Sequence, residues 1–458
     1  MTFESGPTYK SAEEVLAKTG FWHWRVFIVV LSACSCWALN ATPFMIPTFA
    51  AECDKCETEK VTIKKEFNVP AGFWGIELMS SALFLGNMCF GLITAYLADI
   101  FGRRIIILIS MFCFGALGAL SIFSTSYAVL LVFRFLQGAF FGTTTTVPYV
   151  LASECVEFRW HPYVIGLLGL WWSVGYSITA LIGYICTTWQ QMMLVTSIPS
   201  ILASIYFYFT LPESFIFLVD NKRVKDINDW INRMQNPKDP VQCNVEHMLQ
   251  QIDATQESMA TNTLSASMKY LIHHKKYMIY LIGSTIISVF AFYLYLGVAV
   301  GTDVKLEELG PYWVYLLGGF IEIPGYLCTP IILTRFRQQY AIAGVHVFAG
   351  CALFSMVVTP SSTKTLYLIE WLVSKFAMSM CFQCMFIFVG DLYPAIIRNT
   401  CVGISTAFGN LGGMFVLQIY AEAQNVLNGK LPMLIYTAMC FINAAVIMSY
   451  PKSIGHEP

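Results

Sequence analysis

The chain is built from long apolar runs separated by polar linkers. A helix that crosses the hydrocarbon core of a bilayer needs about 20 mostly apolar residues, and Asp, Lys or Arg near its centre is costly. The pattern therefore predicts an all-α membrane protein with about twelve transmembrane helices. These helices are expected near residues 25–49, 71–97, 104–123, 127–151, 162–185, 190–211, 277–299, 310–333, 341–359, 366–390, 399–421 and 431–450.

A long polar stretch, residues 212–275, divides the predicted helices into two sets of six. Similar segments recur in the two sets about 235 residues apart, such as "YLADIFGRR" at 96–104 and "ILTRFRQQ" at 332–339. Because many transporters are built from such repeats, we predict two pseudo-symmetric six-helix bundles. The predicted divisions are an N-terminal tail (1–24), a first bundle (25–211), a linker (212–275), a second bundle (276–450) and a C-terminal tail (451–458).

The distribution of charge predicts an orientation in the membrane. Most of the 27 Lys and Arg residues fall on one side when both termini are cytoplasmic, as the positive-inside rule requires. A Lys cluster within residues 55–65 is the exception. In the linker, "VKDINDWINRM" places apolar side chains on one helical face, so this helix is expected against the membrane surface or the helix ends. We expect a multi-pass protein of the plasma membrane.

The composition argues against several other classes of protein. Charged residues make up only 12% of the chain and hydrophobic residues 57%, which leaves too few charges for the surface of a soluble protein. The net charge of -1 offers no field for nucleic acid. Most cysteines lie in apolar runs as packing residues. Cys53 and Cys56, in a polar stretch, are expected to form a local disulfide or remain free thiols rather than bind metal.

Motifs for nucleotide hydrolysis and enzyme catalysis do not occur in the sequence. There is no phosphate-binding G-x-x-x-x-G-K-[ST] loop, no H-E-x-x-H and no G-x-S-x-G. We therefore expect a non-enzymatic protein without cofactor or metal. Any uphill transport would be coupled to another ion, and otherwise the movement is downhill.

Charged residues at the predicted cytoplasmic helix ends are candidates for conformational gating. Asp99, Arg103 and Arg104 surround a turn at Gly102, where a bulky side chain would obstruct helix approach. Such carboxylates and guanidinium groups could latch the inner face shut and separate when it opens. The alternative is that they only anchor the helices at the interface. Further candidates for this role are Glu154, Arg159, Glu213, Asp391 and Arg398.

Charges inside the apolar runs are the sharper signals, because they are costly and mark transport pathways. Glu322 lies about midway along its predicted helix, and Lys375 and Arg134 lie about a third of the way along theirs. Glu322 and Lys375 are expected either to face a cavity or to form a buried ion pair. Arg134 fits cavity and packing roles equally, and Glu77 is expected at the rim.

Polar and aromatic side chains within the predicted helices complete the candidate substrate site. Aromatic faces attract organic cations, although they also pack helices together. The candidates are Asn40, Trp172, Tyr176, Tyr293, Tyr295, Gln383 and Asn410. Asn410, amid small residues in "GNLGGM", could equally form an interhelical hydrogen bond.

Five segments carry a resemblance to a known family: "ADIFGRR", "FRFLQG", "LPESFIFL", "IEIPGYL" and "DLYPAIIRNTCVGISTAFGNLGGM". Over nearly the whole chain the sequence resembles the major facilitator superfamily, and within it the organic cation, organic anion and carnitine transporters of solute carrier family 22. The resemblance implies a central cavity, a rocker-switch mechanism and uptake or exchange of small organic ions. It also implies charge recognition at Glu322 and at position 410.

The sequence departs from that family in several places. The first outer loop, about residues 51–70, is short, as in the similar synaptic vesicle protein 2-related proteins. Asn410 is neutral where cation carriers have an acid and anion carriers an Arg. The second copy of the Asp-Gly-Arg-Arg motif reads Thr334, Arg337, Gln338 and Gln339, which predicts a degraded latch. Asp391 replaces the usual Glu, and Phe215 replaces a Pro.

Our leading hypothesis is a monomeric carrier of small organic ions in the lipid bilayer, with a cation or zwitterion preferred. It depends on the intramembrane acid Glu322, the nearby aromatic residues and the absence of Arg at 410. The alternatives are a non-transporting receptor or scaffold of the same fold and a carrier of intracellular vesicles.

Overall fold

The computed structural model describes residues 11–51, 60–70, 75–235, 243–256, 264–300, 310–360, 363–393, 395–424 and 426–450. Within these ranges, 12 helices are long and apolar enough to cross a membrane. They confirm the predicted all-α membrane fold, because each coincides with an apolar run of the sequence. Cys53 and Cys56, for which a disulfide or free thiols were expected, lie outside the described residues.

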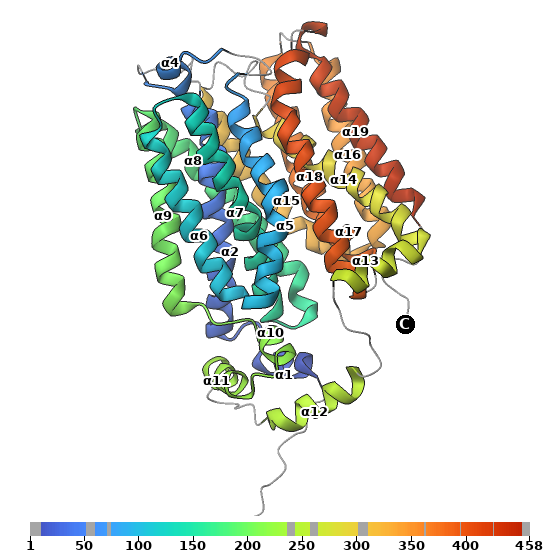
Figure 1. Ribbon diagram of the computed structural model, residues 1–458. Coiled ribbons are helices and arrows are strands. Elements are labelled where there is room, and N and C mark those ends of the chain that lie inside the picture. Colours follow the sequence, from blue (N-terminus) through green and yellow to red (C-terminus); the bar gives the residue numbers. More distant parts are fainter. Residues whose placement is uncertain are drawn as a thin grey trace, which may run out of the picture.

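The long helices form two groups, which we call the N-half and the C-half (Figure 1). The N-half contains α2 (Trp24–Met45) with its short continuation α3 (Pro47–Ala50), α5 (Leu78–Phe101), α6 (Arg103–Leu120), α7 (Tyr127–Glu154), α8 (His161–Ile185) and α9 (Trp189–Thr210). The C-half contains α14 (Lys275–Val300), α15 (Pro311–Arg335), α16 (Gln338–Val358), α17 (Lys364–Asp391), α18 (Ala395–Ala423) and α19 (Leu431–Ser449).

Short helices mark the two ends of the bundle. We call one end the loop end, where α4 (Ile63–Phe67) lies. The other is the linker end, with α1 (Ala12–Thr19), α10 (Phe215–Asp220), α11 (Val224–Met234), α12 (Val245–Gln256) and α13 (Leu264–His273). Among the described residues, the short 3-10 turns are η1 (Ser121–Phe123), η2 (Phe158–Trp160) and η5 (Leu427–Gly429).

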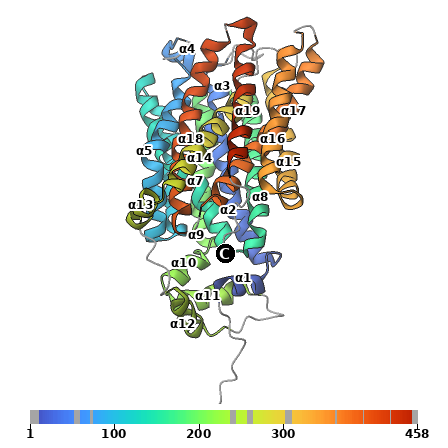
Figure 2. The same ribbon diagram turned by 90° about the vertical axis from the view of Figure 1, so that its right-hand side faces the viewer.

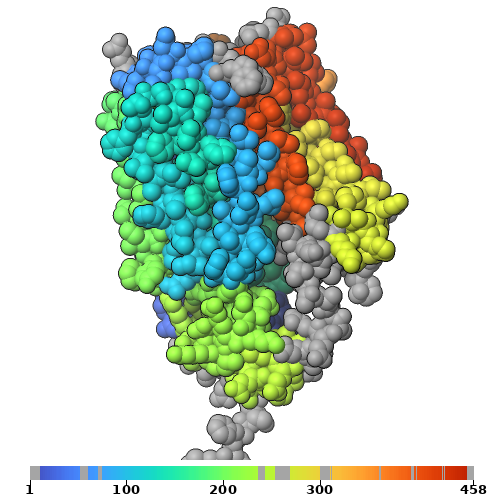
Figure 3. Space-filling view, in the orientation of Figure 1, coloured from blue at the N-terminus to red at the C-terminus, as the bar shows by residue number. Residues whose placement is uncertain are grey.

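The halves meet mainly along two seams, α8 against α15 and α5 against α18. Figure 3 shows α5 and α18 in contact on the face toward the viewer. By contrast, α6 packs against α7 and α9, and α16 against α17 and α19, so these helices lie on the outside of their own halves. This arrangement leaves α2, α7, α14 and α17 to complete the interior, where the candidate site lies.

The second span differs from its prediction, because it covers Leu78–Phe101 instead of 71–97. Its linker end is set by Gly102, whose φ of 107° and ψ of 150° suit only glycine. The helix therefore continues to Phe101, and α6 begins directly afterwards at Arg103.

At the linker end, α1, α10 and α11 pack together against the N-half (Figure 2), whereas α13 packs against α14 and α18 of the C-half. The apolar face of α11 is buried through Ile227, Trp230 and Met234, and the Trp230 ring lies 4.6 Å from that of Phe215 in α10. These side chains share one apolar cluster with Leu151 near the end of α7. Of the two sequence-based alternatives for this amphipathic helix, the contacts support packing against helix ends.

Candidate functional site

Two fully buried charged groups form an ion pair in the C-half. The Lys375 ammonium of α17 contacts the Glu322 carboxylate of α15, and both side chains have 0% exposure. Each residue lies well inside its helix, far from either end. Because a single charge at this depth would be very unfavourable, each charge requires the other. The structure thus realises the ion pair that was one of the two sequence-based alternatives.

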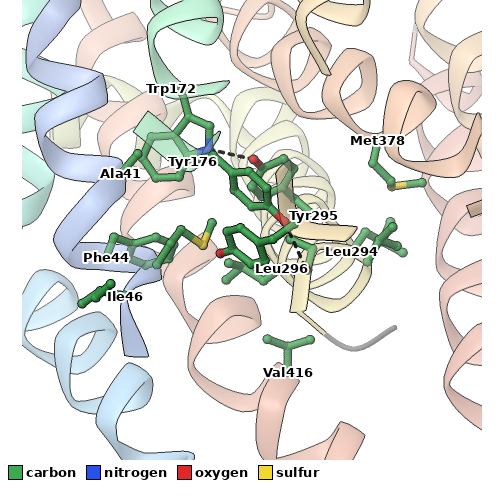
Figure 4. Close-up of a cluster of buried hydrophobic side chains, with 14 of the residues drawn as sticks. Ala41, Phe44, Ile46, Trp172, Tyr176, Leu294, Tyr295, Leu296, Met378 and Val416 are labelled. Atoms are coloured by element: carbon green, nitrogen blue, oxygen red, sulfur yellow. Dashed lines mark hydrogen bonds between the residues drawn. The ribbon is translucent and has the colours of Figure 1, made fainter. Parts of the chain in front are cut away.

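Hydrogen bonds connect this ion pair to the N-half. The Tyr295 hydroxyl of α14 donates to Glu322 Oε2 at 2.9 Å, and Trp172 Nε1 of α8 donates to the Tyr295 oxygen at 2.7 Å. Figure 4 shows Trp172 and Tyr295 facing each other, with Tyr176 beside them. A continuous chain of donors and acceptors therefore runs from α8, through α14, to the acid of α15.

Aromatic rings also surround the ammonium group. Lys375 Nζ lies 4.3 Å from the centre of the Tyr176 ring and 5.3 Å from that of Tyr295. Both distances are within the range of cation–π attraction. The ammonium is thus held by one carboxylate and two aromatic faces, and one of those faces belongs to the N-half.

Stacked aromatic side chains close the site toward the loop end. Tyr176 stacks on Tyr315 of α15, with ring centres 4.1 Å apart and planes 3° apart. Phe49 of α3 packs on Tyr315 at 5.1 Å and on Tyr312 at 5.3 Å. Because Tyr176 and Phe49 belong to the N-half and their partners to the C-half, these contacts hold the halves together at this end.

Lys60 reinforces the closure of the loop end. Its ammonium donates to the carbonyl groups of Gly183, Tyr184 (3.3 Å) and Cys186 (2.9 Å) at the C-terminus of α8. It also lies 5.1 Å from the ring centre of Tyr312 in the C-half. Burial lowers the pKa of Lys60 from its ordinary value. Free carbonyl groups at a helix C-terminus favour a cation, so the site retains the charge despite burial.

The closure toward the linker end is thinner. Phe382 of α17 lies 4.9 Å from the Tyr295 ring, and Phe386 lies 6.5 Å from Trp37 of α2. Phe382, Phe386 and Trp37 are each partly exposed, whereas Tyr176 and Tyr315 at the opposite side of the site are buried. The aromatic closure on this side is therefore less buried than the closure at the loop end.

The remaining predicted substrate residues divide between the centre and the helix seams. The Gln383 amide lies between the halves; in the orientation that satisfies both of its ends, its nitrogen donates to the Tyr326 carbonyl at 3.1 Å and its oxygen accepts from the Gly166 N–H at 3.2 Å. Tyr293 instead packs against Tyr436 of α19, with ring centres 5.8 Å apart. The structure therefore places Gln383 beside the central site and directs Tyr293 away from it.

Asn410 lies in the seam between α5 and α18. Its side-chain oxygen accepts from Asn87 Nδ2 at 2.9 Å, and its nitrogen donates to the Thr406 carbonyl at 2.9 Å. This geometry is the interhelical hydrogen bond that was the alternative to substrate recognition. In the state described here, both ends of the Asn410 amide are engaged by protein.

Arg134 is buried within the N-half, apart from the central pair. Nη1 donates to the Pro43 carbonyl at 3.0 Å and to Gln137 at 2.8 Å. The Pro43 carbonyl needs such a donor because the residue four positions later, Pro47, has no N–H. Arg134 therefore secures the junction of α2 and α3. Asn40 plays a similar packing role, donating to the Thr144 carbonyl at 2.7 Å.

The predicted gating charges of the first half form a brace at the linker end of the N-half. Arg103 pairs with Asp99 at 3.1 Å and with Glu154 of α7 at 3.0 Å. The Glu213 carboxylate accepts from the N–H groups of Arg103 (2.9 Å) and Arg104 (3.1 Å), which are unpaired donors at the start of α6. The brace therefore joins α5, α6 and α7 to the beginning of the linker.

Part of the same brace recurs in the C-half, where neutral glutamine donors replace the two arginines. Gln338, about 235 positions after Arg103, donates to Asp391 of α17 at 2.6 Å. Gln339 donates to the Ile447 carbonyl at 2.9 Å near the end of α19, as Arg104 donates to Tyr208 near the end of α9. The second motif was expected to be degraded. In the structure it keeps two corresponding hydrogen bonds, with neutral amide donors, while Thr334 at the position of Asp99 donates to the Ile331 carbonyl of its own helix at 3.0 Å.

These contacts change the interpretation of the predicted latch. Among the described residues, the contacts of Asp99, Arg103 and Glu154 remain within the N-half and its linker, so they do not join the halves. Arg159 pairs with neighbouring Glu157 at the surface. In the C-half, Arg398 donates to the Tyr393 carbonyl at 3.3 Å. Arg103 and Glu154 therefore act as an internal brace between elements of one half, whereas Arg159 and Arg398 contact groups close to them in the chain.

Replacing Gly102 should weaken the N-half brace. The left-handed conformation at this position costs other residues roughly 2 kcal/mol, and a Cβ would lie 2.4 Å from Glu213 Oε2. We expect Gly102→Ala to lower the free energy of unfolding in detergent, measured by denaturant titration, by roughly that amount. Gly344→Ala is the matched control, since a Cβ there meets nothing within 4 Å. Equal effects at both positions would contradict the assigned role.

Sequence reasoning did not identify Lys60, Phe49 or Tyr315 as parts of the site. Tyr315 could have been found, because it lies about two helical turns before Glu322 and so shares its face. Phe49 and Lys60 carried no comparable signal. Lys60 follows a polar loop, and its carbonyl partners come from the end of α8, a long way along the chain.

Comparison with known proteins gives consistent matches over most of the chain. A family model described as the Major Facilitator Superfamily matches residues 26–417. Solute carrier family 22 member 3 of Rattus norvegicus is 24% identical, over 86% of this chain and 70% of that protein. The organic cation/carnitine transporter 2 of Mus musculus is 22% identical, over 83% and 67%.

Solved structures share the fold at low sequence identity. A structure of the xylose transporter XylE from E. coli, described as partially occluded and inward open, superposes with a TM-score of 0.72. It is 14% identical and covers 93% of this chain and 97% of its own. At this identity the similarity shows the architecture of twelve helices and carries no information about the substrate.

Proposed function

Because the chain belongs to the Major Facilitator Superfamily, we propose that it is a secondary or facilitative transporter of small organic ions that works by alternating access. The observation that carries the proposal is the fully buried Glu322–Lys375 pair. It is linked to the opposite half, because the Tyr176 ring lies against Lys375 and Trp172 donates to Tyr295, which donates to Glu322. The relatives named as organic cation and carnitine transporters support a small charged substrate, with a cation or zwitterion preferred.

The contacts suit a two-state movement of the halves. The loop end is closed by Tyr176 on Tyr315 and by Phe49 on Tyr312, and each of these contacts joins opposite halves. The braces at the linker end lie within single halves, so each half can move as a rigid body around the central site. Separation at either end would hydrate Glu322 and Lys375 from that side.

The orientation follows from the charges of the linker end. Arg103, Arg104 and the basic linker residues lie there, and such residues remain on the cytoplasmic side. The loop end then faces the cell exterior, and both tails are cytoplasmic. The carrier acts as a monomer in the plasma membrane, and a coupled ion drives any uphill movement.

The test uses cells that express the protein and measures their uptake of quaternary ammonium tracers. Some tracers carry a carboxylate and others do not. We expect Glu322→Gln to reduce uptake of the transported tracer by at least about tenfold, because its carboxylate recognises the ammonium group. Glu370→Gln is the matched control, since Glu370 accepts from the Thr359 hydroxyl at 2.8 Å outside the central site. Unchanged uptake by Glu322→Gln at equal surface expression would refute the role of this acid.

A further inference from the structure

The groups that would bind an ammonium ligand are already occupied by an ammonium group of the chain. Lys375 Nζ rests against the Glu322 carboxylate, 4.3 Å from the Tyr176 ring centre and 5.3 Å from that of Tyr295. A carboxylate combined with aromatic faces is the arrangement by which proteins recognise quaternary and primary ammonium ions. A substrate cation can therefore reach Glu322 only by displacing Lys375.

The acid is fixed more firmly than the lysine. Glu322 accepts hydrogen bonds from Tyr295 at 2.9 and 3.2 Å, and Tyr295 is held in turn by Trp172 at 2.7 Å. Lys375 is carried by a flexible four-carbon chain. A Cβ at neighbouring Gly318 would lie only 3.3 Å from Lys375 Cε, so the glycine allows the lysine chain to lie close against α15. Displacement thus moves the lysine and leaves the acid in place.

Charge balance decides which substrates can cause that displacement. The pair is neutral as a whole, and both side chains have 0% exposure. A bound monocation would pair with Glu322 and leave the Lys375 ammonium as an unpaired charge in a dry site. A bound monoanion would pair with Lys375 and leave the Glu322 carboxylate unpaired. Such unpaired buried charges are strongly unfavourable. A zwitterion supplies a partner for each group and keeps the site neutral.

Building on the proposed transport function, we propose that Lys375 is a tethered cation that fills the ammonium subsite of the empty carrier and selects zwitterions. The ammonium group of the substrate takes the place of Lys375 on Glu322, between Tyr176 and Tyr295. The carboxylate of the substrate binds the displaced Lys375. Lys375 is thus a specificity-determining residue that excludes simple cations.

Three probes of similar shape test this assignment by counterflow into proteoliposomes. Glycine betaine is the zwitterion, choline the cation, and tert-butylacetate the anion in which carbon replaces the quaternary nitrogen. Wild-type protein should exchange glycine betaine at least about tenfold faster than the other two. Lys375→Met should reverse the preference toward choline, and Glu322→Gln should reverse it toward tert-butylacetate.

Paired variants guard against loss of folding in the single variants. The charge exchange Glu322→Lys with Lys375→Glu keeps the site neutral, so it should exchange glycine betaine faster than either single variant does. Faster exchange of choline than of glycine betaine by the wild type would overturn the assignment. The assignment would also be overturned if the ratio of choline exchange to glycine betaine exchange were the same in reconstituted Lys375→Met as in the wild type. In both cases organic-ion transport would stand, whereas no exchange of any probe by any of these proteins would overturn transport of small organic ions as well.

Discussion

Lys375→Met is expected to lower the free energy of unfolding by about 3–5 kcal/mol, because it leaves the Glu322 carboxylate charged and unpaired in the protein interior. The carboxylate keeps hydrogen bonds from the neutral Tyr295 and Ser173 side chains but loses its charged partner. Denaturant titration in detergent micelles measures the change. Lys364→Met, at the exposed start of the same helix, should change it by less than about 0.5 kcal/mol.

A double-mutant cycle separates the ion pair from the loss of either side chain. Glu322→Gln combined with Lys375→Met removes both charges, so the double variant should recover most of the stability lost by Lys375→Met alone. Additive losses would show that the two charges do not depend on each other. That result would remove the basis for a neutral central site.

Arg103→Gln is expected to cost about 3 kcal/mol in the free energy of unfolding, because it removes the charged partner of the mostly buried Glu154. The glutamine can still donate to one carboxylate, as Gln338 does to Asp391 in the C-half at 2.6 Å. Denaturant titration again provides the measurement. Arg159→Gln, which removes a pair whose arginine side chain is 65% exposed, is the control and should have little effect.

The reciprocal change tests whether the two braces are equivalent. Gln338→Arg introduces into the C-half the residue found at the corresponding position of the N-half, beside the Asp391 carboxylate. We expect this variant to fold with nearly unchanged or greater stability, because the new charge meets an acid. A loss as large as that of Arg103→Gln would contradict the structural correspondence of the two motifs.

The helices and the intramembrane charges were predictable because the bilayer imposes few solutions. Apolar runs of sufficient length give helices, and the unlike charges of Glu322 and Lys375 within two of them left a buried ion pair as one of two alternatives, the other being a cavity. Which face of a helix meets the centre was harder to predict. Tyr293 and Tyr295 lie two positions apart on α14, so they point in different directions, and only Tyr295 contacts the acid.

The role of the gating charges could not be read from the sequence for a related reason. A motif such as Asp99 with Arg103 identifies groups that attract each other but not the helix that provides further partners. The structure supplies Glu154 and Glu213 from the same half, so the charges brace the N-half. The cross-half contacts that close the loop end are aromatic, as in Tyr176 with Tyr315, and aromatic residues occur throughout the chain.

Pulsed electron paramagnetic resonance distances at the two ends test the central claim most directly. Spin labels at Ile185 and Trp313 report on the loop end, and labels at Phe101 and Tyr340 on the linker end, since each pair is exposed and joins opposite halves. Labels at Ile185 and Phe123, both in the N-half, are the control. If the halves rock around the Glu322–Lys375 pair, the transported probe will change the two cross-half distances in opposite directions and leave the control unchanged. Cross-half distances that stay fixed, or that widen together, would contradict alternating access.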